Sequence, residues 1–229
     1  MDGDLDRRQL IINSLETKAV LKHKVYSNTL DVFDMLKEAL HEMSSDINEE
    51  LTTSRIVKIE YRDRGKFEAQ MQIASDVLIF TMHTNVFEFC REHSVHTCDY
   101  VKNNPNNSYC GVINVYDFLS DSFKHNRTED DGYLIARIYI NHEKCFFVEG
   151  KRQEGYSYKI FGDQKITEEI LVDIIETSVL YAVDFDLLIP PFDSQKYIGV
   201  DQLNTKNEGT KIKTAKRLGF QYNTDDILE

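Results

Sequence analysis

The stretch VKIEYRDRGKFEAQMQI, residues 57–73, decides the fold class of this chain. Apolar and polar residues alternate with period two in both of its halves, and a turn around Gly65 separates them. Because successive side chains of a β-strand point to opposite faces, this pattern predicts a β-hairpin with one buried and one wet face. Hairpins pair antiparallel strands, so the stretch favours a mostly antiparallel sheet.

Further strands extend this sheet on the C-terminal side of the hairpin. A buried strand is expected at 77–82, and residues 86–89 either continue it or start another. A further strand is expected at 109–116, followed by a short helix at 117–123. A second hairpin is predicted from two arms at 133–140 and 145–148, with a turn at 141–144. The expected total is a sheet of about five or six strands built from two hairpins.

Helices are predicted at both ends of the chain. Residues 4–50 read as helix in two pieces, with Ser27 and Asn28 as caps of the second piece. This piece carries an apolar stripe at spacings of three and four: Phe33, Leu36, Leu40, Met43 and Ile47. Thr167 caps a C-terminal helix whose first turn holds Glu168 and Glu169. We expect this helix to pack on the sheet, which gives an α+β fold class.

Three segments are expected along the chain. They are an N-terminal helical segment (1–50), an α+β core domain (51–191) and a C-terminal polar extension (192–229). The extension carries a local basic cluster over 206–217. Neither a Gly-rich dinucleotide loop nor a phosphate-binding P-loop occurs in the sequence, which disfavours those nucleotide sites.

The charge balance narrows the function classes. The 229 residues hold 27 Lys plus Arg and 39 Asp plus Glu, a formal net charge of −12. Broad nucleic-acid binding is disfavoured, because phosphate neutralisation by Lys and Arg supplies most of its affinity. We expect no membrane association, because no apolar run approaches the ~20 residues that span a bilayer. The acidic N-terminus does not resemble a secretory signal. Four cysteines suggest reduced thiols and a cytoplasmic location.

One end of the second hairpin gathers polar side chains that can perform catalysis. Asp131 precedes the first arm, and Glu149 and Lys151 end the second, two residues apart and so on one face. Asp131 and Glu149 are candidate Mg²⁺ ligands, and Lys151 is a candidate for positioning a water. The alternative is a solvated hairpin end, where acids and lysines meet water.

This arrangement is similar to the core motif of the PD-(D/E)XK nuclease families. The match covers Asp131 to Lys151, with Asp130 where the family has proline. The resemblance implies a Mg²⁺-dependent nuclease with Asp131, Glu149 and Lys151 as catalytic residues. It also implies that an upstream helical glutamate takes part, for which Glu42, Glu49 and Glu50 are equivalent candidates.

Cysteines and histidines give two further hypotheses. Cys90, His93, His96 and Cys98 lie within nine residues and can form a zinc site, although structural zinc usually uses two separated ligand pairs. The alternative is a buried Cys90 at a strand end with solvent-exposed histidines. Cys110, in an apolar strand, is the candidate for an activated thiol, against the alternative of an inert buried side chain.

The leading functional hypothesis is a non-enzymatic intracellular binding or regulatory protein that acts through protein–protein contacts. No cofactor is expected under it, and the helical stripe either packs on the chain's own core or mediates contact with a protein partner or a second copy. The first alternative is the nuclease, with Mg²⁺ as cofactor and nucleic acid as substrate. The second is a small-molecule sensor whose abundant Tyr and Phe line a pocket.

Overall fold

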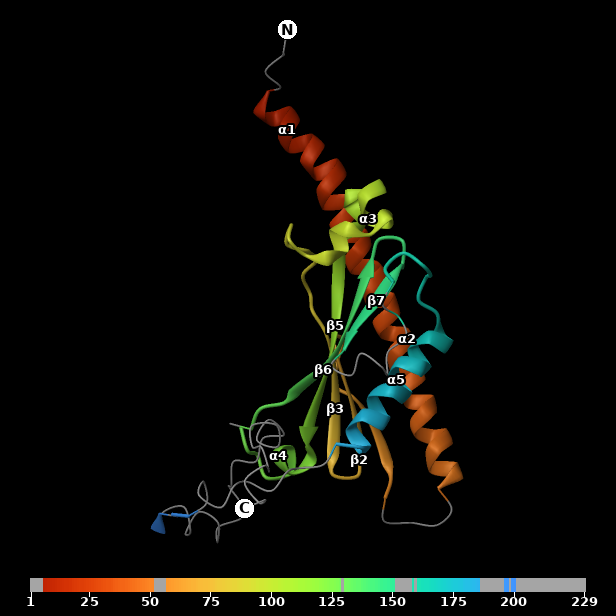
Figure 1. The fold of residues 1–229 in the computed structure, drawn as a ribbon, viewed down its shortest axis with the longest axis vertical. Helices are drawn as coiled ribbons and strands as arrows, with labels where there is room; N and C mark the ends of the chain where they lie inside the picture. Colours follow the sequence, from red (N-terminus) through yellow and green to blue (C-terminus); the bar gives the residue numbers. More distant parts are fainter. Residues whose placement is uncertain are drawn as a thin grey trace, which may run out of the picture. The chain divides into compact units, whose positions relative to one another are not determined.

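The computed structural model describes residues 6–51, 57–128, 130–150, 158, 160–185, 196–197 and 199–200. It confirms the α+β class, with a long N-terminal helical region, an antiparallel sheet and a C-terminal helix, shown in Figure 1. The predicted extension at 192–229 and its basic cluster lie almost entirely outside the described residues. The division at 50/51 and 191/192 stays a prediction.

Within the described residues, seven strands form one sheet in the order β1-β2-β3-β5-β6-β7, and a short β4 pairs with β5. Their bounds are β1 Ile59–Asp63, β2 Glu68–Ile73, β3 Asp76–Met82, β4 Phe87–Glu88, β5 Tyr109–Leu119, β6 Tyr133–Asn141 and β7 Phe146–Gly150. Both predicted hairpins are confirmed, because β1 pairs with β2 and β6 with β7 in antiparallel register. The sheet exceeds the predicted five or six strands through the two-residue β4.

Most helical residues in the part of the chain that the structure describes belong to α1 (Arg7–Ser14), α2 (Val20–Glu50) and α5 (Glu168–Val183). A π-helical turn, η1 (Leu15–Ala19), joins α1 to α2. Short helical pieces complete the described part: η2 Ser94–Thr97, α3 Asp99–Asn103, η3 Pro105–Ser108 and α4 Ser120–Lys124. The helix predicted at 117–123 begins only at Ser120, because β5 runs on to Leu119.

The predicted helix start at Ser27 and Asn28 is wrong. Both residues lie inside α2, which begins at Val20. The side chain of Asn28 caps no helix and instead donates to the backbone oxygen of Asn141, at 3.2 Å. Ser27 is exposed. A residue type that favours helix caps is tolerated within a helix when its side chain points to water or finds a tertiary partner.

The helical stripe predicted at 33–47 is buried. Phe33, Leu36 and Leu40 are fully buried and Met43 nearly so, whereas Ile47 is half-buried. Burial of these side chains favours the interpretation that the stripe packs on the chain's own core. It leaves little of the stripe for contact with another protein.

The chain forms two compact units, which we describe separately. The first comprises Met1–Ala39, Thr81–Asn114 and Ala136–Asp173, and the second comprises Leu40–Phe80, Val115–Ile135 and Ile174–Glu229. In the second unit, the hairpin β1–β2 receives the side chain of Asn48. The amide of Asn48 donates to the Ile59 oxygen at 2.7 Å and accepts from the Ile59 nitrogen at 3.0 Å, which satisfies this part of the sheet edge.

In the first unit, α2 approaches β5 very closely. A Cβ atom added to Gly111 of β5 would lie 2.1 Å from Oγ1 of Thr29 in α2. Both residues are buried, and the Thr29 hydroxyl donates to the backbone oxygen of Val25 at 2.7 Å. Glycine at 111 therefore permits this helix to lie directly on the strand.

Candidate functional site

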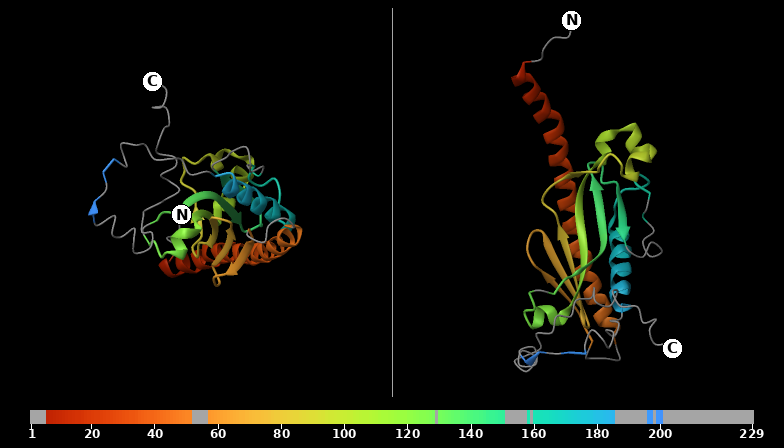
Figure 2. Two further views of the ribbon diagram at one scale, coloured as in Figure 1. Left: turned by 90° about the horizontal axis from the view of Figure 1, so that it is seen from below. Right: turned by 60° about the vertical axis from the view of Figure 1, so that its left-hand side comes forward.

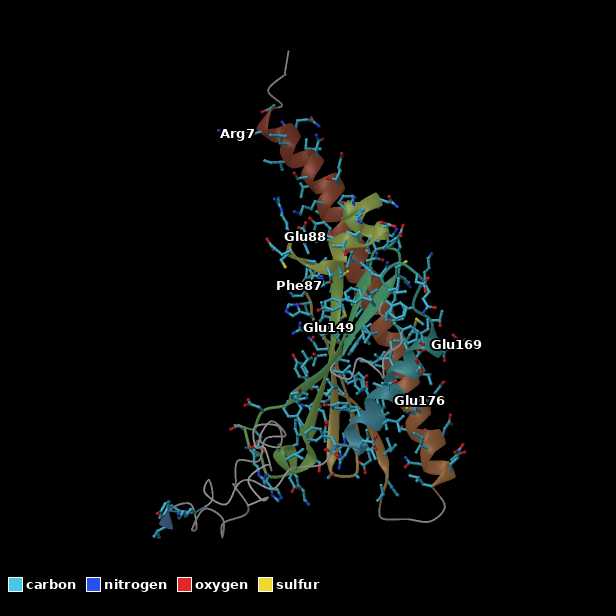
Figure 3. All side chains as sticks on the ribbon, in the orientation of Figure 1. Arg7, Phe87, Glu88, Glu149, Glu169 and Glu176 are labelled. Atoms are coloured by element: carbon cyan, nitrogen blue, oxygen red, sulfur yellow. The ribbon has the colours of Figure 1, made fainter. Side chains whose placement is uncertain are left out.

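Glu149, the central residue of the predicted nuclease motif, is engaged in contacts within its own hairpin. It lies on β7 opposite Arg137 of β6, and an Arg137 nitrogen is 3.6 Å from a Glu149 carboxylate oxygen. The hydroxyl of Tyr139 donates to the same oxygen at 2.9 Å. Figure 3 labels Glu149 on this hairpin. An exposed ion pair of this kind is an ordinary strand-surface interaction.

The structure describes only one of the other two predicted catalytic residues. Asp131 is exposed in the segment that precedes β6. Lys151 lies outside the described residues. No group of three or more His, Cys, Asp or Glu side chains in the described part of the chain is placed to hold a metal ion. The nuclease site of Asp131, Glu149 and Lys151 therefore stays a prediction.

The four residues of the predicted zinc site differ from one another in their contacts and in their burial. His93 accepts a hydrogen bond from the Val95 backbone nitrogen at 3.1 Å, and a ring nitrogen of His96 lies 3.2 Å from the Phe89 oxygen. Cys98 packs against a buried apolar cluster. Cys90 is exposed and the two histidines are half-buried. The expectation of a buried Cys90 with exposed histidines is therefore wrong, because β4 ends at Glu88, before Cys90.

Cys110, the candidate nucleophile, is fully buried in β5. Burial raises the pKa of its thiol, because a thiolate loses hydration in an apolar environment. A nucleophilic cysteine needs the opposite shift and access to a substrate. The inert alternative is favoured.

The abundant aromatic side chains of the first unit pack on one another. Phe147 stacks on Tyr139 with ring centroids 4.7 Å apart and contacts Phe161 at 5.1 Å. Phe89 reaches Tyr139 at 5.0 Å, and Tyr100 meets Phe161 edge-on at 5.3 Å. Such pairs stabilise a core beyond their area burial. These rings are core side chains, and the small-molecule sensor stays a prediction.

A buried polar hub centres on Asn141, at the end of β6. Its side-chain oxygen accepts from the backbone nitrogens of Glu143 and Cys145, at 2.9 and 3.1 Å, and its amide donates to the Tyr100 hydroxyl at 2.9 Å. The hydroxyl of Tyr100 in turn donates to the Glu143 carboxylate. Burial is the first cause that raises the pKa of Tyr100. The hub fixes the turn between β6 and β7, a structural role.

His142, in the same turn, gives a testable pH dependence. Burial lowers its pKa below 6.5, and Lys24 adds to this effect by charge repulsion, although Glu143 opposes it. A lowered folded-state pKa means that the unfolded chain binds the proton more readily. His142 therefore contributes stability that is present above about pH 6.5 and is lost as the pH falls through its folded-state pKa.

We expect His142→Gln to lose less thermal stability than the wild type when the pH falls from about 7 to about 5. The measurement is the unfolding midpoint of both proteins across this range. Equal losses in the two proteins would contradict the assignment to His142.

The feature that the sequence reasoning missed is the exposed apolar surface of α1. No residue of α1 is buried, and Figures 1 and 2 show this helix running beyond the end of β5. The exposed fractions are 48% for Leu10, 60% for Ile11, 59% for Leu15 and 59% for Val20, and Ile12 reaches 36%. Large apolar side chains gathered on one exposed element mark an interaction site.

The π-helical turn η1 aligns these side chains. Ile11 and Ile12 lie four and three residues before Leu15, so they share its side of the helix. In η1 the backbone nitrogen of Val20 donates to the oxygen of Leu15, five residues earlier, which places Val20 one turn beyond Leu15. We call Ile11, Ile12, Leu15 and Val20 the α1 stripe.

The side of the helix that carries the α1 stripe faces solvent along α2 as well. Lys24 and Asp31, which follow Val20 at helical spacing, are exposed, whereas Val25, Thr29 and Val32 are fully buried. The α1 stripe therefore lies on a different side of the helix from the buried residues of α2. The sequence signal that could have found it is the cluster Leu10-Ile11-Ile12 within a helix that also carries Arg7 and Arg8.

Comparison with family models, curated proteins and solved structures found no match for this chain. Among the described residues, no helix combines the length and apolar content required to cross a membrane. The most distinctive surface of the described residues is the α1 stripe.

Proposed function

We propose that this chain is a non-enzymatic cytoplasmic binding or regulatory protein, and that α1 is its contact element for another protein. The observation that carries this proposal is the α1 stripe, a run of large apolar side chains on a helix with no buried residue.

The energetics of α1 support docking. Burial of apolar surface stabilises a complex by about 25 cal/mol per Å². The α1 stripe stays exposed to water in the isolated chain, so this stabilisation becomes available when a partner covers it. The helix runs without a break from α1 through η1 into the packed helix α2, so α1 extends an existing helix and needs no partner in order to form. Anchors at helical spacing are the pattern by which a helix occupies a groove in a partner.

The thiol chemistry supports a reducing compartment. All four cysteines are free, and Cys110 and Cys145 are buried in the first unit. Free buried thiols are common in proteins of the cytoplasm, where disulfides are rare. Two of the candidate catalytic residues have other surroundings: Cys110 is buried and Glu149 is paired with Arg137.

The proposal predicts that Leu15→Glu abolishes a complex. In native extracts of the cells that make the protein, we expect the wild type to elute above its monomer mass of 26.7 kDa and Leu15→Glu to elute as the monomer. A glutamate in the stripe would have to be desolvated on docking, at a cost of several kcal/mol.

Thr17→Glu is the matched control, because it adds the same charge to the same exposed helix outside the stripe. It should leave the elution volume unchanged. Both variants should keep the wild-type unfolding midpoint within about 2 °C, since neither side chain is buried. A wild type that elutes as a bare monomer, or a complex that survives Leu15→Glu, would contradict the proposal.

A further inference from the structure

The π-helical turn η1 inserts one residue into a helix that is otherwise α-helical from Arg7 to Glu50. In η1 the backbone nitrogen of Val20 donates to the oxygen of Leu15, five residues earlier, whereas an α-helical turn closes over four. Each residue of an α-helix turns the chain by about 100°. Compared with a continuous α-helix of the same sequence, the extra residue therefore rotates α1 by about 100° relative to α2.

This rotation decides which side of the helix the α1 stripe occupies. About 18 residues make five turns of an α-helix, so residues at that separation share a side. Without η1, Ile11 would lie in line with Thr29, and Leu15 would lie in line with Phe33. Thr29 and Phe33 are fully buried, yet Ile11 and Leu15 are 60% and 59% exposed. With the extra residue, Leu15 lies instead in line with Asp34, which is exposed.

The packing of this helix on the first unit begins within η1. Lys18 lies over the ring of Tyr109, 5.5 Å from its centroid. N-terminal to η1, no residue of α1 is buried, and Figures 1 and 2 show α1 beyond the end of β5. The side-chain hydrogen bonds of Gln9 and Thr17 end on Asn13 of the same helix. Among the described residues, a turn of α1 about its own axis therefore breaks no buried contact.

We propose that η1 is a conformational device that gives α1 two registers. In the first register, which the structure shows, the extra residue lies in η1 and the α1 stripe faces away from the buried side of α2. In the second register, the extra residue has moved out at the N-terminal end of α1 and the helix is continuous. Ile11 and Leu15 then lie on the side of Thr29 and Phe33.

The two registers differ little in what they cost the rest of the fold. Passage between them opens only exposed backbone hydrogen bonds of residues 7–19, and exposed terminal segments open at a low cost in free energy. The α-helical geometry of the second register is the more common one, whereas π-turns are rare and occur frequently at functional sites. The buried side of α2 keeps its contacts in both registers.

The regulatory role of this device rests on the proposed function of α1 as a contact element. A partner that docks on the α1 stripe binds the first register and so draws molecules out of the second. The fraction of molecules in the second register lowers the apparent affinity for the partner in proportion. The position of the extra residue therefore sets how much of the protein is competent to bind.

Deletion of Ala19 isolates the first register. It removes one residue of η1, so a continuous α-helix then presents Leu15 on the same side as in the structure, and the second register is lost. Ala19 is exposed, so its deletion removes no buried side chain. The matched control is deletion of Gly3, which shortens the chain by one residue ahead of α1 and leaves η1 intact.

The distance between two spin labels on the full chain measures the register. One label replaces Asn13, and the other replaces Lys102 or Glu88, exposed residues of the first unit. Figure 3 labels Glu88. Cys90→Ser and Cys98→Ala remove the accessible thiols in every variant. A helix with its side chains is about 10–12 Å across, so a turn of about 100° displaces the label on residue 13 by about 8 Å.

We expect two distance populations in the wild type and after deletion of Gly3. Deletion of Ala19 should leave one, which coincides with one of the two wild-type distances. A single distance common to the wild type and the Ala19 deletion would overturn the device, because α1 then keeps one register. A single wild-type distance that differs from that of the deletion would show a helix without the π-turn and overturn it as well. Two distances after deletion of Ala19 would assign the motion to another segment.

Elution in native extracts separates the device from the proposed function. Deletion of Ala19 should keep the complex that Leu15→Glu removes, because every molecule then holds the first register. Loss of the complex in the Ala19 deletion would overturn the device. If Leu15→Glu removes a complex while the spin labels show one register, the contact role of α1 survives and the device fails. Two registers in a chain that forms no complex would leave the device without its regulatory role and contradict the proposed function.

Discussion

Gly111→Ala is expected to lower the free energy of unfolding by about 3 kcal/mol, because α2 leaves no room for a side chain on β5. The new Cβ would lie 2.1 Å from Oγ1 of Thr29 and 2.8 Å from its Cβ. Rotation of the Thr29 side chain removes the first clash but not the second, because the Cβ atom is fixed to the helix backbone. For a chain of this length the unfolding midpoint should fall by roughly 6–12 °C.

Two further variants assign this loss to the helix–strand contact. Gly199→Ala is the control, since no described residue lies within 4 Å of a Cβ at that glycine, and it should change stability by under about 0.5 kcal/mol. Thr29→Gly has a cost of its own, because it removes a buried side chain and places a glycine within a helix. In that background Gly111→Ala should cost much less than in the wild type. A Gly111→Ala midpoint within about 2 °C of the wild type would show that α2 does not approach β5 this closely.

Asn141→Ala is expected to cost about 3 kcal/mol, because three hydrogen bonds of a fully buried side chain disappear together. The backbone nitrogen of Cys145 would be left buried without its acceptor, and that of Glu143 would lose the same oxygen. Thermal or urea unfolding measures the effect.

The partner at the other side of the hub gives an internal check. Tyr100→Phe removes the hydroxyl that accepts from the Asn141 amide. Because the two side chains share one network, the losses of the single variants should not add in the double variant. Asn13→Ala, at an exposed position of α1, should stay within about 0.5 kcal/mol of the wild type. Additive losses at 100 and 141 would contradict the hub.

Periodicity predicted the sheet well for a physical reason. In β1, Ile59 is buried while Glu60, Arg62 and Asp63 are exposed, so the alternation in the sequence matches the alternation of faces. The pattern fails at Gln70 of β2, which is buried. Its side-chain oxygen accepts from Arg64, in the turn of the same hairpin, at 2.8 Å, a partner that the alternation of apolar and polar residues does not reveal.

The helices were harder to predict because local preference and tertiary contact compete. Ser27 and Asn28 have the chemistry of caps, yet α2 runs through them and Asn28 bonds to Asn141, over a hundred residues away. Conversely, the α1 stripe has the composition of a buried face. Only the structure shows that its side chains are exposed and that the π-helical turn aligns Leu15 with Val20.

The predicted sites differ in how far the structure reaches them. Glu149 is paired with Arg137, whereas Lys151 lies outside the described residues. The nuclease motif therefore stays a prediction from sequence spacing. The two-residue spacing in the sequence places Glu149 and Lys151 on one face of the strand. It does not predict which charged residue of the neighbouring strand lies opposite Glu149. Arg137 occupies that position through the register of β6 and β7.

The most direct test of α1 as the contact element is site-specific photocrosslinking in the cells that make the protein. A benzophenone amino acid replaces Leu15 in the α1 stripe or, as the control, Thr17 on the same helix. We expect irradiation to give a discrete covalent adduct from position 15 and little or none from position 17. An adduct of twice 26.7 kDa would identify the second copy as the partner. Equal crosslinking at both positions, or no adduct at position 15, would contradict α1 as a protein contact surface.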